Sequence, residues 1–305
     1  MDVQPHLLNL SAYINQNLEK DLPLSHLAKR VGLSPFHFHR KFGAYFGESL
    51  HQHIKRLRLE RAAFSLIHGS TPVRQIARDS GYKTVSAFSH AFSGFAGESP
   101  TRYRYLAGTD ERKVSRVAPA EAGRLEPAWV GDLAPLEFSF LRAMGGENDV
   151  QRSVFDSVEM VRKLVGPIHG DDAEHDDASA AGNGQAVADG AAVASFDCIV
   201  ATSDVYGIFK NGDFRIDVGF ETKLIASDRA TVIGKQTLPG GRYARFDFRS
   251  TADDALAHCR SISLRGLQSR GETPRLSQYF VRFTTRPGQA ASELSDYQLF
   301  VPLTG

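Results

Sequence analysis

Two short stretches of the chain place side chains suited to non-covalent recognition on one face of an expected helix. They span residues 36–43 and 86–93, and in each stretch the outward positions recur at helical spacing. Small polar residues on such a face let the helix backbone approach a groove wall closely. The outward positions are Phe36, His39, Arg40 and Gly43 in the first stretch and Ser86, Ser89, His90 and Ser93 in the second.

The sequence lacks the common motifs of covalent catalysis. G-x-S-x-G and HExxH are absent, and Cys198 and Cys259 sit in apolar contexts typical of buried thiols. With no CxxC, neither a disulfide framework nor a cysteine zinc site is indicated. Pairs such as His37 and His39 point about 200° apart on a helix and cannot share one ion. We therefore expect no enzyme activity, no metal and no cofactor.

The two stretches occupy corresponding positions in an internal repeat. Residues 23–32 align with residues 72–81 at an offset of 49, and one extra residue in the second copy then makes the offset 50. A repeat indicates that one supersecondary unit is used twice. The later aligned positions are Phe38, Phe42, Gly47, Glu48 and Ser49 in the first copy and Phe88, Phe92, Gly97, Glu98 and Ser99 in the second.

Each copy predicts a helix, a turn and a second helix. The first helix ends at Gly32 or Gly81, where a left-handed residue can close it. The second helix begins at Ser34, followed by Pro35, in the first copy and near Thr84 in the other. Phenylalanine stripes on the second helices are expected to pack inward. A short helix, a glycine turn and a second helix is the arrangement of a DNA-reading module.

Residues 49–68 predict one helix of 20 residues between the two copies. At about 1.5 Å per residue this helix spans roughly 30 Å. Successive major-groove faces of a duplex lie about 34 Å apart, so the helix would set both reading helices on one side of DNA. Its basic side chains are Lys55, Arg56, Arg58 and Arg61. They are placed to meet phosphate or to form an ordinary solvated face, and we expect Lys55 and Arg56 to contact DNA.

The net charge of +1 hides an asymmetry between the first third and the rest of the chain. Residues 1–107 carry 14 Lys and Arg against 7 Asp and Glu, and the remaining residues carry 22 against 28. A basic first third attached to an acidic remainder favours a polyanionic partner for the first third. It is also compatible with an ordinary solvated surface.

The second copy carries a recognisable pattern, IAxxxGYxxxSxFSxxFxxxxGxSPxxYR, over residues 76–104. This pattern resembles the signature of the AraC/XylS family of bacterial transcription regulators, and the resemblance covers about residues 7–107. It implies a seven-helix unit that binds an asymmetric site through two adjacent major grooves of double-stranded DNA. The family's reading positions, carried onto this chain, are Phe36, His39 and Arg40 in the first copy and Val85, Ser86, Ala87 and His90 in the second.

The chain departs from the family pattern at His90, where arginine is usual, and at Ser93, where lysine is common. An arginine can bind guanine in a bidentate way, whereas a mostly neutral imidazole offers less. We therefore expect Arg40 to make the strongest base contact. The second helix would read shape and methyl groups through Val85 and Ala87.

The pattern changes beyond residue 107. Residues 108–125 are polar and read as a linker, and residues 126–305 predict strands and helices in the order of a βαββ unit used twice. Residues 136–143 alternate like a strand, residues 149–165 read as a helix, and Asn211-Gly212 is a hairpin signal. The fold class is thus multidomain: an all-α tandem helix-turn-helix domain (1–107), then an α+β domain with a mobile insertion at about residues 167–195.

Short motifs in this second part, LPGGRYARF, RIDVGFE and YQLFVPL, look like the GyrI-like effector-binding domain. The resemblance covers about residues 126–305 and implies a cleft between two repeats for a small, apolar or aromatic effector. Ser277 stands where relatives often carry a glutamate, which favours a neutral or anionic effector unless Glu221 or Asp217 substitutes. Candidate wall residues, about half of them expected to be core, are Trp129, Phe138, Phe140, Tyr206, Phe209, Tyr243, Phe246, Tyr279 and Phe283.

The chain shows neither an apolar signal-peptide core nor an 18-residue apolar run, so we expect a cytoplasmic protein. The leading hypothesis is a transcription regulator that binds DNA through residues 1–107 and senses an effector through the rest, with RNA polymerase as a further candidate partner. Two alternatives remain open. One is an enzyme, either a hydrolase built on the second part or a DNA-repair protein that uses the reading module, and the other is a partner-binding module that takes no ligand.

Overall fold

The computed structural model describes residues 4–107, 126–146, 149–166, 168, 197–202, 213–226, 232–262, 267, 271–287, 290 and 292–305. Several expected features lie outside the described residues. They are the linker at 108–125, the insertion at 167–195 except for Ile168, the Asn211-Gly212 turn, Tyr206 and Phe209. Within the described ranges, no helix combines the length and the apolar character needed to cross a membrane.

Residues 4–107 form a helical part in which the predicted repeat is confirmed. Ser34 and Thr84 cap the two corresponding helices α3 and α6, and Gly47 and Gly97 end them with φ angles of 68° and 81°. The helices are α1 (Gln4–Gln16), α2 (Leu24–Arg30), α3 (Pro35–Phe46), α4 (Leu50–His68), α5 (Val73–Asp79), α6 (Val85–Ala96) and α7 (Pro100–Ala107).

Each helix-turn-helix unit has its own phenylalanine core. Phe38 and Phe42 of α3 are fully buried, as are Phe88 and Phe92 of α6. The long helix α4 joins the units and begins with a capping box at Ser49, whose hydroxyl accepts a hydrogen bond from the backbone of Gln52. The sequence thus predicted both the buried stripes and the linking helix.

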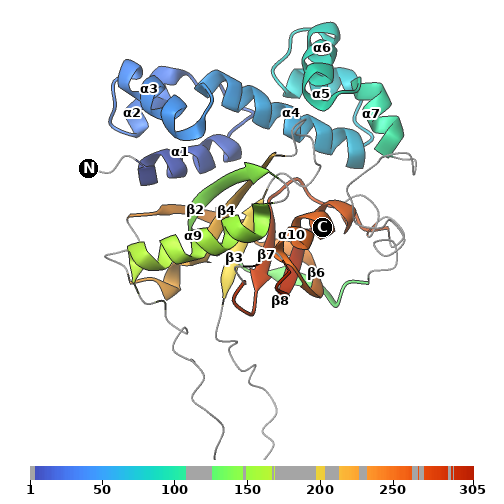
Figure 1. Ribbon diagram of the computed structural model, residues 1–305. Helices are drawn as coiled ribbons and strands as arrows, with labels where there is room; N and C mark the ends of the chain where they lie inside the picture. The colour runs from blue at the N-terminus through green and yellow to red at the C-terminus, as the bar shows by residue number, and fades with distance from the viewer. Residues whose placement is uncertain are drawn as a thin grey trace, which may run out of the picture.

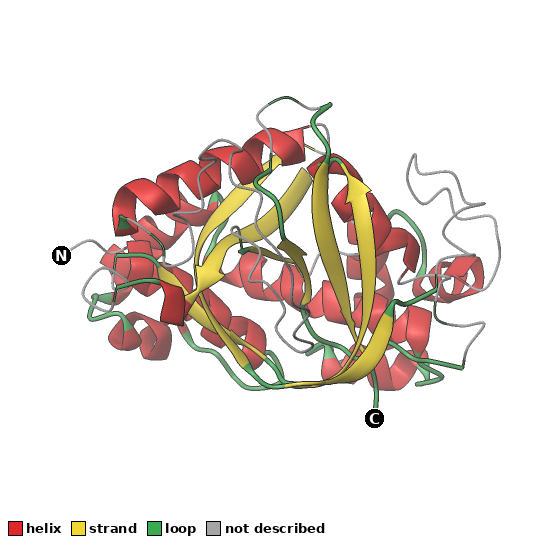
Figure 2. Cartoon of the chain, turned by 90° about the horizontal axis from the view of Figure 1, so that it is seen from below, coloured by secondary structure: helices red, strands yellow, loops and turns green. Residues whose placement is uncertain are grey.

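Residues 126–305 form a sheet part whose eight described strands make one antiparallel sheet. Its order is β1-β6-β8-β7-β3-β4-β2-β5, and the strongly twisted strands can be followed in Figure 2. The strands are β1 (Trp129–Leu133), β2 (Leu136–Gly146), β3 (Cys198–Thr202), β4 (Asp213–Glu221), β5 (Gly234–Leu238), β6 (Gly241–Ser250), β7 (Tyr279–Phe283) and β8 (Ser295–Pro302).

Helices cover both faces of this sheet. On one face lie α9 (Val150–Val165) and α10 (Ala252–Ser261), and α9 buries a valine stripe that includes Val154, Val158 and Val161. On the other face lies α1 of the helical part, so that α1 and α4 stand between the sheet and the two helix-turn-helix units (Figure 1). An antiparallel sheet with helices is therefore confirmed for the sheet part. The helical and sheet parts form one packed structure.

Candidate nucleic-acid interface

The first reading helix, α3, presents the predicted side chains to solvent. Phe36 is 75% exposed, and His39 and Arg40 are exposed as well. The backbone of His37 donates to the hydroxyl of Ser34 at 3.4 Å, which fixes the start of α3. A partner that covered the Phe36 ring would remove apolar surface from water, which is favourable. The face is therefore available for contact.

The second reading helix, α6, has the same arrangement. Val85 is 39% exposed, and Ser86, Ala87 and His90 lie on the same open surface. The backbone of Ala87 donates to the Thr84 hydroxyl at 3.1 Å and fixes the start of α6. All seven predicted reading positions are thus exposed on α3 and α6, while the opposite sides of both helices are buried.

The four basic side chains of α4 do not share one environment. Lys55 is exposed, whereas Arg58 donates to the carbonyls of Leu18 and Lys20 at 3.0 and 3.1 Å. Arg56 is only 12% exposed and is bound by two carboxylates. The expectation that Arg56 meets phosphate is therefore wrong, because this side of α4 faces the sheet part.

A groove of about 450 Å³ lies between the two helix-turn-helix units. His51, Lys55 and Arg58 line it from α4, and Gly81 and Tyr82 line it from the turn before α6. Positions 51, 55 and 58 share one side of the helix at 100° per residue, whereas positions 53, 56 and 60 share the opposite side. Helix α4 thus carries a solvent-facing basic side and a buried polar side.

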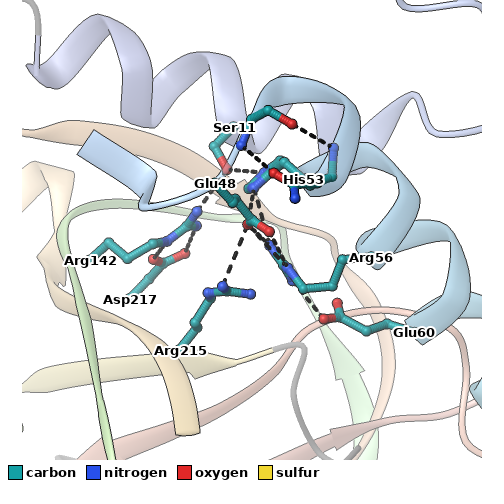
Figure 3. Close-up of polar contacts among 10 residues, drawn as sticks. Ser11, Glu48, His53, Arg56, Glu60, Arg142, Arg215 and Asp217 are labelled. Carbon is teal, nitrogen blue, oxygen red and sulfur yellow. Dashed lines mark hydrogen bonds and ion pairs between the residues drawn. The ribbon is translucent and has the colours of Figure 1, made fainter. Parts of the chain in front are cut away.

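The buried side of α4 meets the sheet part in a polar cluster that Figure 3 shows. Glu48, which precedes α4, lies at its centre. Its carboxylate oxygen Oε1 is 2.9 Å from His53 Nδ1, 2.9 Å from Arg56 Nη2 and 3.5 Å from Nη2 of Arg215 in β4. Arg56 also donates to Glu60 at 2.6 Å. Charges from both parts of the chain are therefore paired inside the contact.

A second group of polar residues continues the cluster into the sheet. Arg142 of β2 binds Asp217 of β4 through two hydrogen bonds of 2.7 and 2.9 Å, and Gln236 of β5 donates to the same carboxylate at 2.9 Å. The third nitrogen of Arg142 donates to the Ser11 hydroxyl of α1 at 2.7 Å. The Ser11 hydroxyl lies 3.3 Å from Nε2 of His53, which closes the connection to α4.

Burial and charge together set the protonation states in this cluster. Burial raises the pKa of Glu48, but hydrogen bonds from His53 and Arg56 and the nearby positive charges lower that pKa to about 2. Burial lowers the pKa of His53 to about 4, against the raising effect of Glu48. The imidazole is thus neutral near pH 7, and a proton on Nδ1 lets it donate to Glu48 and accept from Ser11.

The aromatic face expected to form an open cleft is instead covered by α1. Leu8 of α1 packs in one cluster with Phe138, Phe140 and Tyr243, all of which are at most 1% exposed. The backbone of Lys235 also donates to the Asn9 side chain at 2.6 Å. These aromatic residues are core of the contact between the two parts, which corrects their assignment as walls of an open cleft.

The other predicted ligand residues fall in different places. Tyr279 is fully buried in the core on the α9 and α10 face, as are Phe246 and Phe283, so none of these three can line a cleft on the α1 face. Trp129 packs half-buried against the aromatic cluster around Phe140. Ser277 is half-buried and lines a cavity between the two parts.

The carboxylates proposed as substitutes for the missing glutamate are already neutralised. Asp217 is bound by Arg142 and Gln236, and Glu221 is bound by Arg282 and Lys223. Neither group is left to balance a cationic ligand.

Sequence reasoning missed the buried polar cluster. One signal for it exists, because His53, Arg56 and Glu60 recur at positions i, i+3 and i+7 and so share one face of α4. Paired opposite charges at this spacing are usually solvated, and only the sheet contact identifies them as buried.

Exposed faces on two capped helices, joined by one long helix, define a tandem helix-turn-helix protein. A family model described as "Helix-turn-helix domain" matches residues 27–105. The regulatory protein SoxS of Escherichia coli K12 is 30% identical over 105 residues, which make up 34% of this chain and 98% of SoxS. The probable transcriptional regulator LumQ of Photobacterium leiognathi is 31% identical over 101 residues. The chain belongs to the AraC family of helix-turn-helix transcription regulators.

The extent of these matches is limited. The LumQ match covers 33% of this chain and 41% of LumQ, and the match to the MmsAB operon regulatory protein of Pseudomonas aeruginosa covers 31% of each. Among solved structures, the C-terminal domain of AraT from Geobacillus stearothermophilus is similar at 28% identity over 39% of this chain and 94% of that chain, with a TM-score of 0.32. The DNA-binding domain of AdpA, solved with a target DNA, has 24% identity over 36% of this chain and 98% of that chain, with a TM-score of 0.33.

Proposed function

We propose that this protein is a sequence-specific DNA-binding regulator that reads two successive major grooves with α3 and α6. One observation carries the proposal: two helices with the same caps and the same buried phenylalanine stripe both leave their outer faces open. A helix whose reading face is solvated while its other face is anchored can enter a groove without unfolding anything.

The length of α4 supports simultaneous contact with two grooves. Its 19 residues span roughly 28 Å at about 1.5 Å each, and successive major-groove faces lie about 34 Å apart. In this arrangement Lys55 and His51, in the groove between the units, lie near the intervening phosphate backbone. Because one chain carries both reading helices, a single copy is sufficient to contact both grooves.

Sequence preference is assigned to the exposed positions of the two helices. Arg40 is exposed, and no hydrogen bond or ion pair holds its guanidinium within the described residues. A guanidinium in this state can bind the O6 and N7 atoms of guanine in a bidentate way. Val85 and Ala87 offer methyl contacts to thymine from α6. Affinity would come mainly from phosphate neutralisation and preference from these positions.

For the sheet part we propose a GyrI-like effector-binding domain made of two βαββ repeats, β2-α9-β3-β4 and β6-α10-β7-β8. Each strand has a counterpart whose number differs by four, so that β1 corresponds to β5, β2 to β6, β3 to β7 and β4 to β8. The sheet order supports the two repeats, because replacing every strand by its counterpart gives the same order read from the opposite edge. Residues 1–107 are then the DNA-binding domain, 108–125 the linker and 126–305 the effector domain. The polar cluster around Glu48 would connect them.

An in vitro selection tests the proposal directly. The full chain is mixed with a library of random double-stranded DNA, bound duplexes are amplified, and the enriched duplex is measured by fluorescence anisotropy against an unselected duplex. We expect two short preferred elements with centres about 10 bp apart and a preference of about 1,000-fold or more over unselected DNA. Enrichment of no sequence, or of one short element alone, would refute the two-groove assignment.

A further inference from the structure

A cavity of about 270 Å³ lies between the helical part and the sheet part. Its walls come from the end of α1, the middle of α4, the β5–β6 connection and the segment 276–278 just before β7. It adjoins a smaller polar cavity of about 40 Å³ beside the Arg142–Asp217 pair, with which it shares Asn15, Leu57, Glu60 and Gln278. Together they run from the surface to the buried polar cluster.

The lining is amphipathic. Apolar surface comes from α4 and from the sheet part, for example from Phe64 and Leu276. Polar surface comes from amides and hydroxyls that can both donate and accept hydrogen bonds. A pocket with apolar walls and a few uncharged polar groups is the usual form of a small-molecule site. The uncharged polar residues of the wall are Asn15, Gln16, Thr237, Ser277 and Gln278.

The charged groups in the lining are already paired. Among the described lining residues of the larger cavity these are Glu60 and Arg61. Glu60 accepts a 2.6 Å hydrogen bond from Arg56, and Arg61 donates to the Asn15 carbonyl at 3.1 Å and lies 3.5 Å from Glu19. A charged ligand would lose hydration without gaining an unpaired counter-charge, whereas a neutral ligand would lose little.

The cavity is distinct from the aromatic face that the GyrI-like resemblance predicts as the ligand cleft. That face is filled by Leu8, and Gly234 lies so close to it that an added Cβ atom would stand 2.7 Å from the Leu8 Cβ atom. The open volume is displaced toward Ser277 and α4. About a third of the lining residues, among them Phe64, therefore come from α4, the helix that spaces the two reading helices.

We infer that this cavity binds a neutral, amphipathic small molecule, with α1 and α4 forming one wall and the sheet part the other. The volume is slightly below the range of about 300–1,000 Å³ for drug-sized ligands, which fits a compact two- or three-ring molecule. A regulatory role for this cavity rests on the proposed function, because a ligand that contacts α4 can change DNA binding only if the chain binds DNA. The binding itself does not depend on it.

N-phenyl-1-naphthylamine is a suitable probe, because it is neutral, amphipathic and gains fluorescence in an apolar site. Titrated into the full chain, it should bind with one site per chain. Leu276→Trp replaces a branched aliphatic side chain at the cavity wall with a bulkier indole ring and should weaken probe binding about tenfold or more. Thr237→Trp, at a second position on the sheet side of the cavity, should do the same. Both positions are solvent-exposed in the fold, so both variants should keep the wild-type melting temperature.

Leu294→Trp is the matched control, because Leu294 is 59% exposed and lies outside the cavity lining. This variant should bind the probe as the wild type does. The sulfonated counterpart, 1-anilinonaphthalene-8-sulfonate, tests the charge argument and should bind about tenfold more weakly. Equal probe affinity in Leu276→Trp, Thr237→Trp and Leu294→Trp would overturn the site, and equal or tighter sulfonate binding would overturn its neutral preference.

The two proposals fail separately in these experiments. Probe binding is measured without DNA, and the selected duplex is measured without probe. Loss of probe binding in the cavity variants with normal DNA preference supports the site and leaves the DNA assignment intact. A chain that binds the probe in the expected pattern but selects no DNA sequence would refute the proposed function and keep the cavity as a ligand site.

Discussion

The guanidinium of Arg142 in β2 donates a hydrogen bond to the hydroxyl of Ser11 in α1, with the two atoms 2.7 Å apart. Because the same guanidinium binds Asp217 in β4, one side chain ties the helical part to two neighbouring strands of the sheet. Asp217 is only 3% exposed and Arg142 is 14% exposed. The two parts of the chain are therefore joined by a buried charged contact in addition to the Leu8 packing.

Arg142→Met should destabilise the folded chain by about 3–5 kcal/mol, because it leaves the buried Asp217 carboxylate with Gln236 as its remaining described partner. Urea unfolding followed by circular dichroism measures this. Arg152→Met is the control; Arg152 is 79% exposed and should contribute less than about 1 kcal/mol. The double variant Arg142→Met with Asp217→Leu should recover most of the loss. A single-variant cost below 1 kcal/mol would contradict the role given to Arg142.

The stability of the fold should fall as the pH drops below about 6.5. The pKa of His53 is lowered from 6.5 to about 4, so between these values the unfolded chain binds more protons than the folded chain. The pKa of Glu48 is lowered from 4.5 to about 2, which extends the loss below pH 4.5. The His53 contribution is on the order of 2 to 3 kcal/mol between pH 7 and pH 4.

Thermal unfolding at pH 7.5, 6, 5 and 4.5 checks this pH dependence. His53→Gln keeps a side chain that can hydrogen-bond but removes the titration, so its melting temperature should vary less between pH 6.5 and 4.5 than that of the wild type. His26, an exposed histidine on α2, provides the control variant His26→Gln, which should keep the wild-type profile. Parallel profiles for wild type and His53→Gln would rule out the assignment.

Arg40→Ala should weaken binding to the selected duplex by about 1–3 kcal/mol, roughly 5- to 150-fold, and should affect unselected DNA much less. The reason is that a base contact contributes to preference, whereas a phosphate contact contributes to all duplexes alike. Anisotropy titrations with both duplexes measure the effect, with Arg152→Ala as the control on α9. An unchanged ratio of the two affinities would exclude Arg40 as a reading residue.

The salt dependence of binding reports the number of phosphates engaged. If about six phosphates are neutralised, the plot of log affinity against log salt concentration should have a slope near −5. Lys55→Ala should make the slope less steep by about 1, because Lys55 lines the groove between the helix-turn-helix units. Arg56→Ala should leave the slope unchanged, since Arg56 is held by Glu48 and Glu60. Equal slopes for wild type and Lys55→Ala would remove Lys55 from the interface.

The helical part was predictable because its signals are local. The caps and the left-handed glycines that end the helices act within a few residues of chain; they are Ser34, Ser49 and Thr84, and Gly47 and Gly97. The same pattern occurs twice because the unit is repeated. The exposed reading faces follow from the same helical spacing. These features needed no information about distant segments.

The contact between the two parts was not predictable in the same way. Alternation along β2 placed Phe138, Phe140 and Arg142 on one face of the sheet, but it did not indicate what covers that face. The cover is Leu8, about 130 positions earlier in the chain, and pairing at such distance leaves no local pattern. For the same reason the sequence alone predicts a phosphate contact for Arg56, although its partners lie on the buried side of α4.

We propose that α4 holds α3 and α6 at a fixed spacing that matches two successive major grooves. Changing the spacing of the elements in the DNA tests this. The duplex obtained by selection is compared by anisotropy with the same duplex carrying 5 bp, about half a helical turn, between its two preferred elements. With this insertion the affinity should fall about 100-fold or more, toward that of unselected DNA. Affinity within about threefold of the original duplex would contradict it.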